Sequence, residues 1–105
     1  MSISFAAPLS GMQVSQYRVD VTAHNVANLN TPGFSEYQTV QTDVSPQGVR
    51  VAALNRVPNP DKTTSNTDLA EQMVALKTDK DSFSADAKVI KVKDQMLGTL
   101  LDMVA

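Results

Sequence analysis

The sequence has no cysteine and no tryptophan, and three Phe and two Tyr supply all of its aromatic side chains. Without cysteine, disulfides and thiolate metal sites are excluded. A chain of 105 residues forms one domain at most, and so few bulky side chains leave little material for a private hydrophobic core. We therefore expect a single domain over residues 1–105 with a thin core of its own.

A strong charge of either sign and a long apolar run are missing as well. Nine Lys and Arg against eleven Asp and Glu leave a formal charge of −2, which does not favour nucleic acid or an anionic membrane as partner. No stretch approaches the roughly 18 apolar residues of a membrane span, and Met1 to Pro8 lacks the regions of a signal peptide. We expect no membrane span, and any export to proceed without a cleaved signal.

Catalytic and metal-binding motifs are absent too. The four glycines are scattered singly and cannot form a phosphate-binding loop, and no serine lies in a nucleophile turn. His24 follows Asp20 by four residues, which places both on one helical face, but no third ligand is nearby. The pair is more typical of a surface or interface. The sequence predicts no enzyme, no cofactor, no metal site and no small-molecule substrate.

The stretch from Leu69 to Val104 carries a heptad pattern that predicts one long helix. Its apolar row contains Leu69, Met73, Leu76, Phe83, Ala87, Ile90, Leu97, Leu101 and Val104, interrupted by Lys80 and Asp94. At about 1.5 Å per residue the helix spans roughly 54 Å, whereas a compact chain of this length has a radius of gyration of about 13 Å. Such a helix protrudes, so we expect other chains to bury much of this row.

Two further features of this helix concern its partners. A second apolar row, formed by Val89, Met96, Leu100 and Met103, makes the apolar surface broad enough to indicate a protein contact. Lys80 and Asp94 either fix register and partner choice or reach into water from the edge of the row. Near them, Asp79 and Asp81 lie among Lys77 and Lys80, and we expect these carboxylates on the solvated face.

A second, shorter helix is predicted from Ile3 to about Asn28. Its apolar residues again recur in heptads, at Phe5, Leu9, Met12, Val19, Ala23 and Val26. Four valines, Pro8 and Gly11 weaken its intrinsic propensity, so packing must hold it. The predicted fold is mainly α, with two long terminal helices that form an antiparallel coiled coil.

The middle of the chain reads as a turn, a short β-hairpin and an extended linker. Asn28 suits a left-handed helix C-cap, and Pro32-Gly33 fits the centre of a tight turn. The predicted strands are Tyr37–Val44 and Val49–Leu54, joined by a turn at Ser45–Gly48. Asn55–Asn66 is then the linker. The predicted parts of the chain are thus the N-terminal helix (1–30), the turn, hairpin and linker (31–66) and the C-terminal helix (67–105).

The start of the long helix carries a capping signal. Thr67 or Asp68 is a plausible N-cap, and Glu71 lies three residues after Asp68, where it could close a capping box. A carboxylate there also suits the positive end of the helix dipole.

Two motifs at opposite ends of the chain resemble the bacterial flagellar rod and hook protein family. The first is Ala27-Asn28-Leu29-Asn30-Thr31-Pro32-Gly33-Phe34, preceded by His24-Asn25-Val26 and closing a helix that contains Leu9-Ser10-Gly11-Met12. The second is Ser65 to Val74, continued by Ala85 to Lys91 and by Asp94 to Leu97. Within the family, the ending Gln95 to Met103 and the short middle look most like the proximal rod proteins.

The resemblance implies an axial component of the flagellar basal body. Members of this family are exported by the flagellar type III apparatus and assemble helically as the periplasmic rod. Their terminal helices pair, line the inner tube and pack against neighbouring subunits. The implied partners are other rod proteins, copies of the chain itself and the export apparatus.

Two functions therefore follow as hypotheses. The first is a structural rod subunit that transmits torque and lines the export channel; the second is a soluble helical-hairpin binding module, an adaptor or regulator that pairs with a client helix. For the first, the predicted turn residues are Asn28, Thr31, Pro32, Gly33 and Phe34. The predicted assembly interface consists of Phe5, Leu9, Met12, Val19, Leu76, Phe83, Ile90, Met96, Leu97, Leu100 and Leu101.

Overall fold

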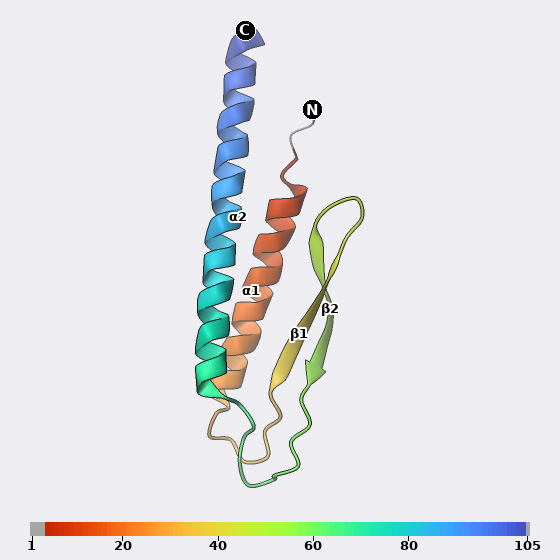
Figure 1. The fold of residues 1–105 in the computed structure, drawn as a ribbon, viewed down its shortest axis with the longest axis vertical. Coiled ribbons are helices and arrows are strands. Elements are labelled where there is room, and N and C mark those ends of the chain that lie inside the picture. Colours follow the sequence, from red (N-terminus) through yellow and green to blue (C-terminus); the bar gives the residue numbers. More distant parts are fainter. Residues whose placement is uncertain (1–3, 105) are drawn as a thin grey trace.

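Residues 4–104, which the computed structural model describes, form two helices with an antiparallel hairpin between them (Figure 1). The elements are α1 (Ala6–Ala27), β1 (Tyr37–Asp43), β2 (Val49–Arg56) and α2 (Leu69–Val104). The mainly helical fold and the hairpin are confirmed. The predicted beginning of the first helix at Ile3 and the end of the second at residue 105 lie outside the described residues.

The molecule is long and thin because α2 is much longer than its partner. The two helices run side by side in opposite directions, and the C-terminal part of α2 continues beyond the N-terminal end of α1 (Figure 1). The chain measures 67 × 24 × 13 Å with a radius of gyration of 18.3 Å, well above the about 13 Å of a compact chain. The protruding helix is confirmed. Coiled-coil packing of the pair stays a prediction.

α1 lies between α2 and the hairpin and contacts both (Figure 1). Tyr37 pairs with Arg56 and Asp43 with Val49, and the register shifts once, after Val40. The strands differ from the prediction only at their ends, since β1 stops one residue earlier and β2 continues to Arg56.

The turn after α1 has the predicted Pro-Gly centre but not the predicted cap. Phe34 N–H donates to the Thr31 carbonyl, and Gly33 has a φ of +73°, which is the geometry of a tight turn with glycine at its third position. The left-handed cap at Asn28 is wrong, because its φ is −103°. Its side-chain amide instead donates to the His24 carbonyl at 2.8 Å and so satisfies a free acceptor of the last helical turn.

The segment predicted as an extended linker is folded against this turn. Buried Asn59 donates to the carbonyls of Phe34 and Thr64, at 2.8 and 2.7 Å. Asn66 accepts a hydrogen bond from the Glu36 amide at 2.7 Å. These bonds hold the loop that leads into α2 close to the one that leaves α1, which fixes where the two helices meet.

Of the two predicted N-caps of α2, Thr67 and Asp68, the structure has Asp68. Its Oδ1 accepts hydrogen bonds from the amides of Ala70 and Glu71, two of the donors that an N-terminus leaves free. The Asp68 amide faces the carboxylate of Glu36, from the start of the hairpin, and acts to lower the pKa of that carboxylate. The capping box expected of Glu71 stays a prediction.

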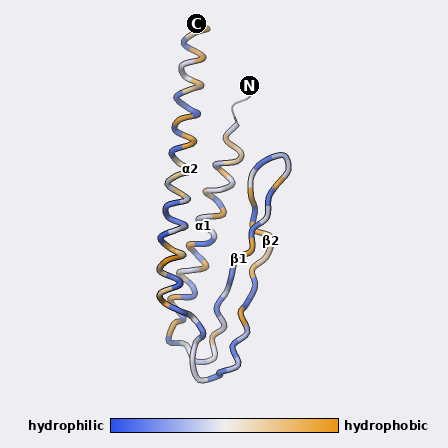
Figure 2. Tube along the Cα trace, viewed as in Figure 1, coloured by the Kyte–Doolittle hydropathy of each residue, from blue (hydrophilic) through white to orange (hydrophobic). Residues whose placement is uncertain are grey.

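The interior of residues 4–104 is polar. Val14 is the only hydrophobic residue there that is buried, at 6% exposure, whereas eight polar or charged residues are buried. Figure 2 shows apolar residues recurring in bands along both helices. The small hydrophobic core expected from the composition is confirmed. Most large apolar side chains of the helices are exposed instead of buried.

Candidate assembly interface

Three neighbouring rows of side chains divide the surface of α1. The first, Ser10, Val14, Tyr17, Val21 and His24, faces the hairpin. The second, Gly11, Ser15, Arg18, Thr22 and Asn25, faces α2. The third contains the predicted apolar residues. Because one residue turns a helix by about 100°, each row is displaced by about that angle from the one before it.

The hairpin is attached to the first row of α1 by aromatic and polar contacts. The rings of His24, Phe34 and Tyr37 pack edge to face or tilted, with centroids 5.5–6.2 Å apart. The Arg56 guanidinium lies 5.2 Å from the Tyr37 ring. His24 therefore serves packing in this structure, and residues 4–104 contain no group of three ligands that could hold a metal ion.

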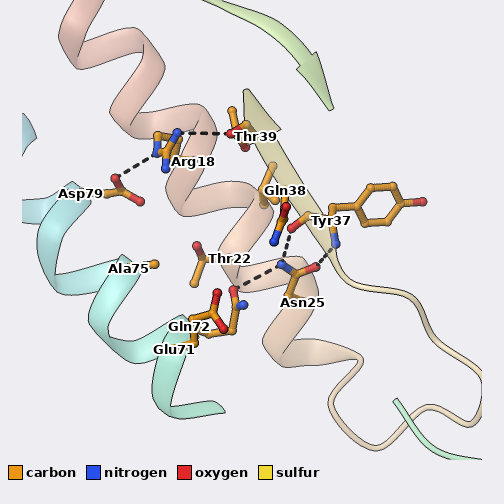
Figure 3. Close-up of a pocket in the computed structure, with 11 residues that line it drawn as sticks. Arg18, Thr22, Asn25, Tyr37, Gln38, Thr39, Glu71, Gln72, Ala75 and Asp79 are labelled. Atoms are coloured by element: carbon orange, nitrogen blue, oxygen red, sulfur yellow. Dashed lines mark hydrogen bonds and ion pairs between the residues drawn. The ribbon is translucent and has the colours of Figure 1, made fainter. Parts of the chain in front are cut away.

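The facing rows of α1 and α2 meet through polar side chains, shown in Figure 3. Arg18 Nε lies 3.2 Å from Asp79 Oδ1, and Asn25 Nδ2 donates to Gln72 Oε1 at 3.2 Å. Asp79 is 6% exposed, so its predicted place on the solvated face is wrong. Arg18 brings it inside because a buried carboxylate needs an opposite charge. Asp81 and Lys77 are exposed as predicted.

The contacts between the helices recur every seven residues. Moving toward the N-terminus of α1, Asn25 meets Gln72, Arg18 meets Asp79, Gly11 meets Asp86, and the Ser4 carbonyl accepts from Lys93 at 2.6 Å. A Cβ on Gly11 would clash with the Asp86 carboxylate, so the glycine lets this side chain lie close against α1. We call these four pairs the polar ladder.

The ladder ends in a buried carboxylate near the start of α2. Gln72 Nε2 donates to Glu36 Oε2 at 3.1 Å, which links α1, α2 and the hairpin through three polar side chains. Burial raises the pKa of Glu36, and the negative charges of Glu71 and Asp68 add to the rise. The hydrogen bonds from the Asp68 amide and from Gln72 lower the pKa, but they do not cancel the effect of burial.

The predicted interface residues lie beside the ladder and remain open in the chain. Except for Met96 and Leu100, they follow by one residue the row that carries the ladder on each helix, as Met12 follows Gly11 and Val19 follows Arg18. On each helix, the apolar row is displaced by one residue, or about 100°, from the row that faces the other helix. Because the two helices are antiparallel, these displacements bring both apolar rows to the same side of the pair. That side is opposite the hairpin.

Their exposure differs along the two helices. Phe5, Met12, Val19 and Ile90 are half-buried. The others are 36–61% exposed, namely Leu9, Leu76, Phe83, Met96, Leu97, Leu100 and Leu101. The structure thus brings the predicted residues other than Met96 and Leu100 together on one side of the helix pair, where they are half-buried or exposed.

Beyond Lys93 the ladder row of α2 changes character. The positions that continue it at the same spacing are Met96, Leu100 and Met103, and all three are exposed. Here α1 has ended, so the row that is polar against α1 becomes apolar where no element among residues 4–104 lies against it (Figure 1). With Leu97 and Leu101 beside it, this end of α2 is apolar over two adjacent rows. We call residues 95–104 the overhang.

Sequence reasoning missed the residues that hold the helices together. These residues are polar side chains of common types, and none was predicted to join two elements: Arg18, Asn25, Glu36, Gln72 and Asp79. One signal was available for the four residues on the helices, because Arg18 and Asn25, like Gln72 and Asp79, recur with the heptad spacing of the apolar rows, displaced by a single position.

The comparisons with known proteins agree with both sequence motifs. Residues 7–34 match a family model described as flagella basal body rod protein, and residues 63–103 match one described as flagellar basal body rod FlgEFG protein C-terminal. No curated protein matches the chain. In residues 4–104, neither helix has the length and apolar character that a membrane crossing requires. The two matches cover α1 with its turn and nearly all of α2, and the chain belongs to the flagellar basal body rod protein family.

Proposed function

We propose that the chain is a rod subunit that assembles through the apolar rows of its two helices, with other rod proteins and with copies of itself. In this proposal the helices line the export channel, and the packed tube transmits torque along the rod. The chain reaches the periplasmic rod through the type III export apparatus. The family supports a structural role and not an enzymatic one.

The observation that carries the proposal is the one-sided apolar surface. Predicted interface residues from both helices lie on the same side of the pair, and the overhang adds Met96, Leu100 and Met103. An exposed apolar surface of this extent on a small protein marks a contact with other proteins. Because the row of Met96, Leu100 and Met103 gives the overhang a second apolar face, different faces of two subunits can meet, and the assembly can grow as an open helix rather than as a closed dimer.

Channel lining and torque follow from the same geometry. A 36-residue α2 is a continuous stiff element along the long axis of the molecule. Packing many such helices side by side buries their apolar rows and ties each subunit to several neighbours. Twisting the tube then loads many interfaces together instead of one flexible joint.

Purified basal bodies from cells that carry the Phe83→Ala and Leu97→Ala variants test the proposal. Each substitution removes a large side chain that we expect to be buried only on assembly, where the loss costs about 2–5 kcal/mol per site. We expect the thermal unfolding of the free chain to change little, while its incorporation into basal bodies and the motility of the cells decline.

The matched control is Lys77→Ala with Asp81→Ala, which removes an exposed ion pair from the same helix. We expect it to assemble normally. Normal incorporation of Leu97→Ala would show that the apolar row of α2 is not an assembly surface. A chain that never enters basal bodies and stays a folded monomer would support the helical binding module instead.

A further inference from the structure

The two helices could in principle pair in either of two rotational states. In the observed state the polar ladder is inside. If each helix turned by one residue position, Leu9 would face Ile90, Ala23 would face Leu76 and Val26 would face Met73. This second state is the apolar pairing that the heptads alone predict.

Burial of apolar surface favours the second state. It would remove the apolar rows from water, whereas the observed state buries Asp79, Asn25 and Gln72, whose desolvation must be offset by their partners. Hydrophobic contact therefore does not select the observed state. The selection must come from the geometry of the polar contacts.

Those contacts all depend on the rotation of α1. Arg18 reaches Asp79 on α2 and also the Thr39 carbonyl and Gln41 Oε1 on β1. Asn25 donates to the Tyr37 carbonyl and accepts from the Tyr37 amide, both at 2.9 Å, while bonding Gln72. A turn of about 100° that brought the apolar row to α2 would carry both side chains away from α2 and toward the face that the hairpin covers, so that the bonds to Asp79 and Gln72 would be lost.

We propose that the polar ladder is a rotational lock, with Arg18 and Asp79 as its central positioning residues. It holds the helix pair in the state that leaves both apolar rows outside, so that the chain cannot cover its own assembly surface. The partner that this surface awaits is another axial subunit, which rests on the proposed function. The rotational state itself is a property of the single chain and does not depend on assembly.

Cysteine cross-linking of the full chain tests the lock. The sequence contains no cysteine, so introduced pairs are the only thiols. Thr22→Cys with Ala75→Cys reports the ladder state, because both residues lie between the helices (Figure 3). Met12→Cys with Ala87→Cys reports the apolar state, in which these positions would face each other. Both pairs are oxidised in dilute protein with a stabilising osmolyte to favour folded chains.

In the parent sequence we expect the Thr22→Cys/Ala75→Cys pair to close and the other to stay reduced. Adding Arg18→Ala and Asp79→Ala should shift disulfide formation to the Met12→Cys/Ala87→Cys pair. The exchange Arg18→Asp with Asp79→Arg, which restores opposite charges, should return it to the first pair. The matched control Lys77→Ala/Asp81→Ala removes the same two charges from the exposed face and should leave the parent pattern unchanged.

If Arg18 and Asp79 only stabilise the fold, Arg18→Ala with Asp79→Ala would lower the unfolding temperature but leave the same cysteine pair cross-linked. That outcome would overturn the lock. Failure of the parent to close the first pair would overturn it too. If the double alanine variant loses its helical circular dichroism, the variant Arg18→Asp with Asp79→Arg serves as the test instead. Failure of this variant to close the Thr22→Cys/Ala75→Cys pair would contradict the lock. The cross-linking experiment uses the unassembled chain, so its result is independent of the basal-body experiment. If the cross-links support the lock but Leu97→Ala enters basal bodies normally, only the proposed assembly surface is refuted.

Discussion

At the scale of single residues, Asn25 connects more of the structure than any predicted interface residue does. It is 1% exposed, and its amide bonds both backbone groups of Tyr37 and the side chain of Gln72. One short side chain thus holds the start of β1 and the start of α2 against the end of α1.

Asn25→Ala should therefore lower the free energy of unfolding by about 2–4 kcal/mol, because it leaves buried polar partners without hydrogen bonds that cost about 1–3 kcal/mol each. Urea unfolding followed by circular dichroism measures the change. Asn30→Ala, at an exposed position of the following turn, is the matched control and should stay within about 0.5 kcal/mol of the parent. Equal effects of the two substitutions would contradict the role of Asn25.

Glu36 makes stability depend on pH in a direction unusual for a carboxylate. Burial raises its pKa in the folded chain, with further increases from the charges of Glu71 and Asp68. The folded state therefore binds the proton more tightly than the unfolded state does. The resulting stabilisation is complete below the unfolded pKa and is lost as the pH rises through the folded pKa.

Glu36→Gln should remove this loss. We expect the variant to be more stable than the parent near neutral pH, and the difference to shrink as the pH falls toward about 4, near the ordinary pKa of a glutamate. Urea unfolding at a series of pH values measures it. Asp81→Asn, at an exposed carboxylate of α2, should not alter the slope. A parent whose stability rises with pH relative to Glu36→Gln would show that the charge is favoured at this site.

At the scale of elements, the turn from Thr31 to Phe34 sets the path by which the chain leaves α1. Gly33 has a φ of +73°, and a Cβ there would lie 3.3 Å from the Lys62 carbonyl oxygen. The same residue donates its amide to the Thr64 carbonyl. The turn is thereby tied to the loop that enters α2, and its glycine is required by both the backbone angle and the space.

Gly33→Ala should destabilise the chain by about 1–2 kcal/mol, the cost of a left-handed conformation for a residue with a Cβ. The informative comparison is Gly98→Ala, because a Cβ at Gly98 in α2 meets nothing within 4 Å. There alanine should stabilise by about 0.5–1 kcal/mol, since glycine is a poor helix former. Thermal unfolding should thus move in opposite directions in the two variants, and a shift in the same direction would rule out the backbone explanation.

The elements themselves were predictable, whereas their mutual rotation was not. The heptad from Leu69 to Val104 gave the bounds of α2, and Pro32-Gly33 gave the turn, because these signals are local. Which row of α1 meets α2 depends on contacts such as Arg18 with Asp79, between residues far apart in sequence. Periodicity reports that a row is apolar, but it does not report whether the same chain or another one covers it.

At the scale of the whole molecule, α2 has two halves with different partners. Its first part lies against α1 and extends to Lys93, which donates a hydrogen bond to the Ser4 carbonyl. Every residue of the overhang within the described chain is exposed. We therefore expect the ladder to serve folding and the overhang to serve assembly, since the overhang is exposed among residues 4–104.

Removal of residues 95–105 should accordingly leave the subunit folded and prevent its assembly. We expect the free energy of unfolding to change by less than about 1 kcal/mol, because exposed positions contribute little, while incorporation into basal bodies is lost. Circular dichroism on the free chain and immunodetection in purified basal bodies measure the two effects. A full-length chain with Met96→Gln, Leu100→Gln and Met103→Gln should fail in the same way, because it keeps the length but not the apolar row. Gln95→Ala with Thr99→Ala keeps that row and should assemble. Normal assembly of the shortened chain would place the interface on the part of the helix pair that α1 covers.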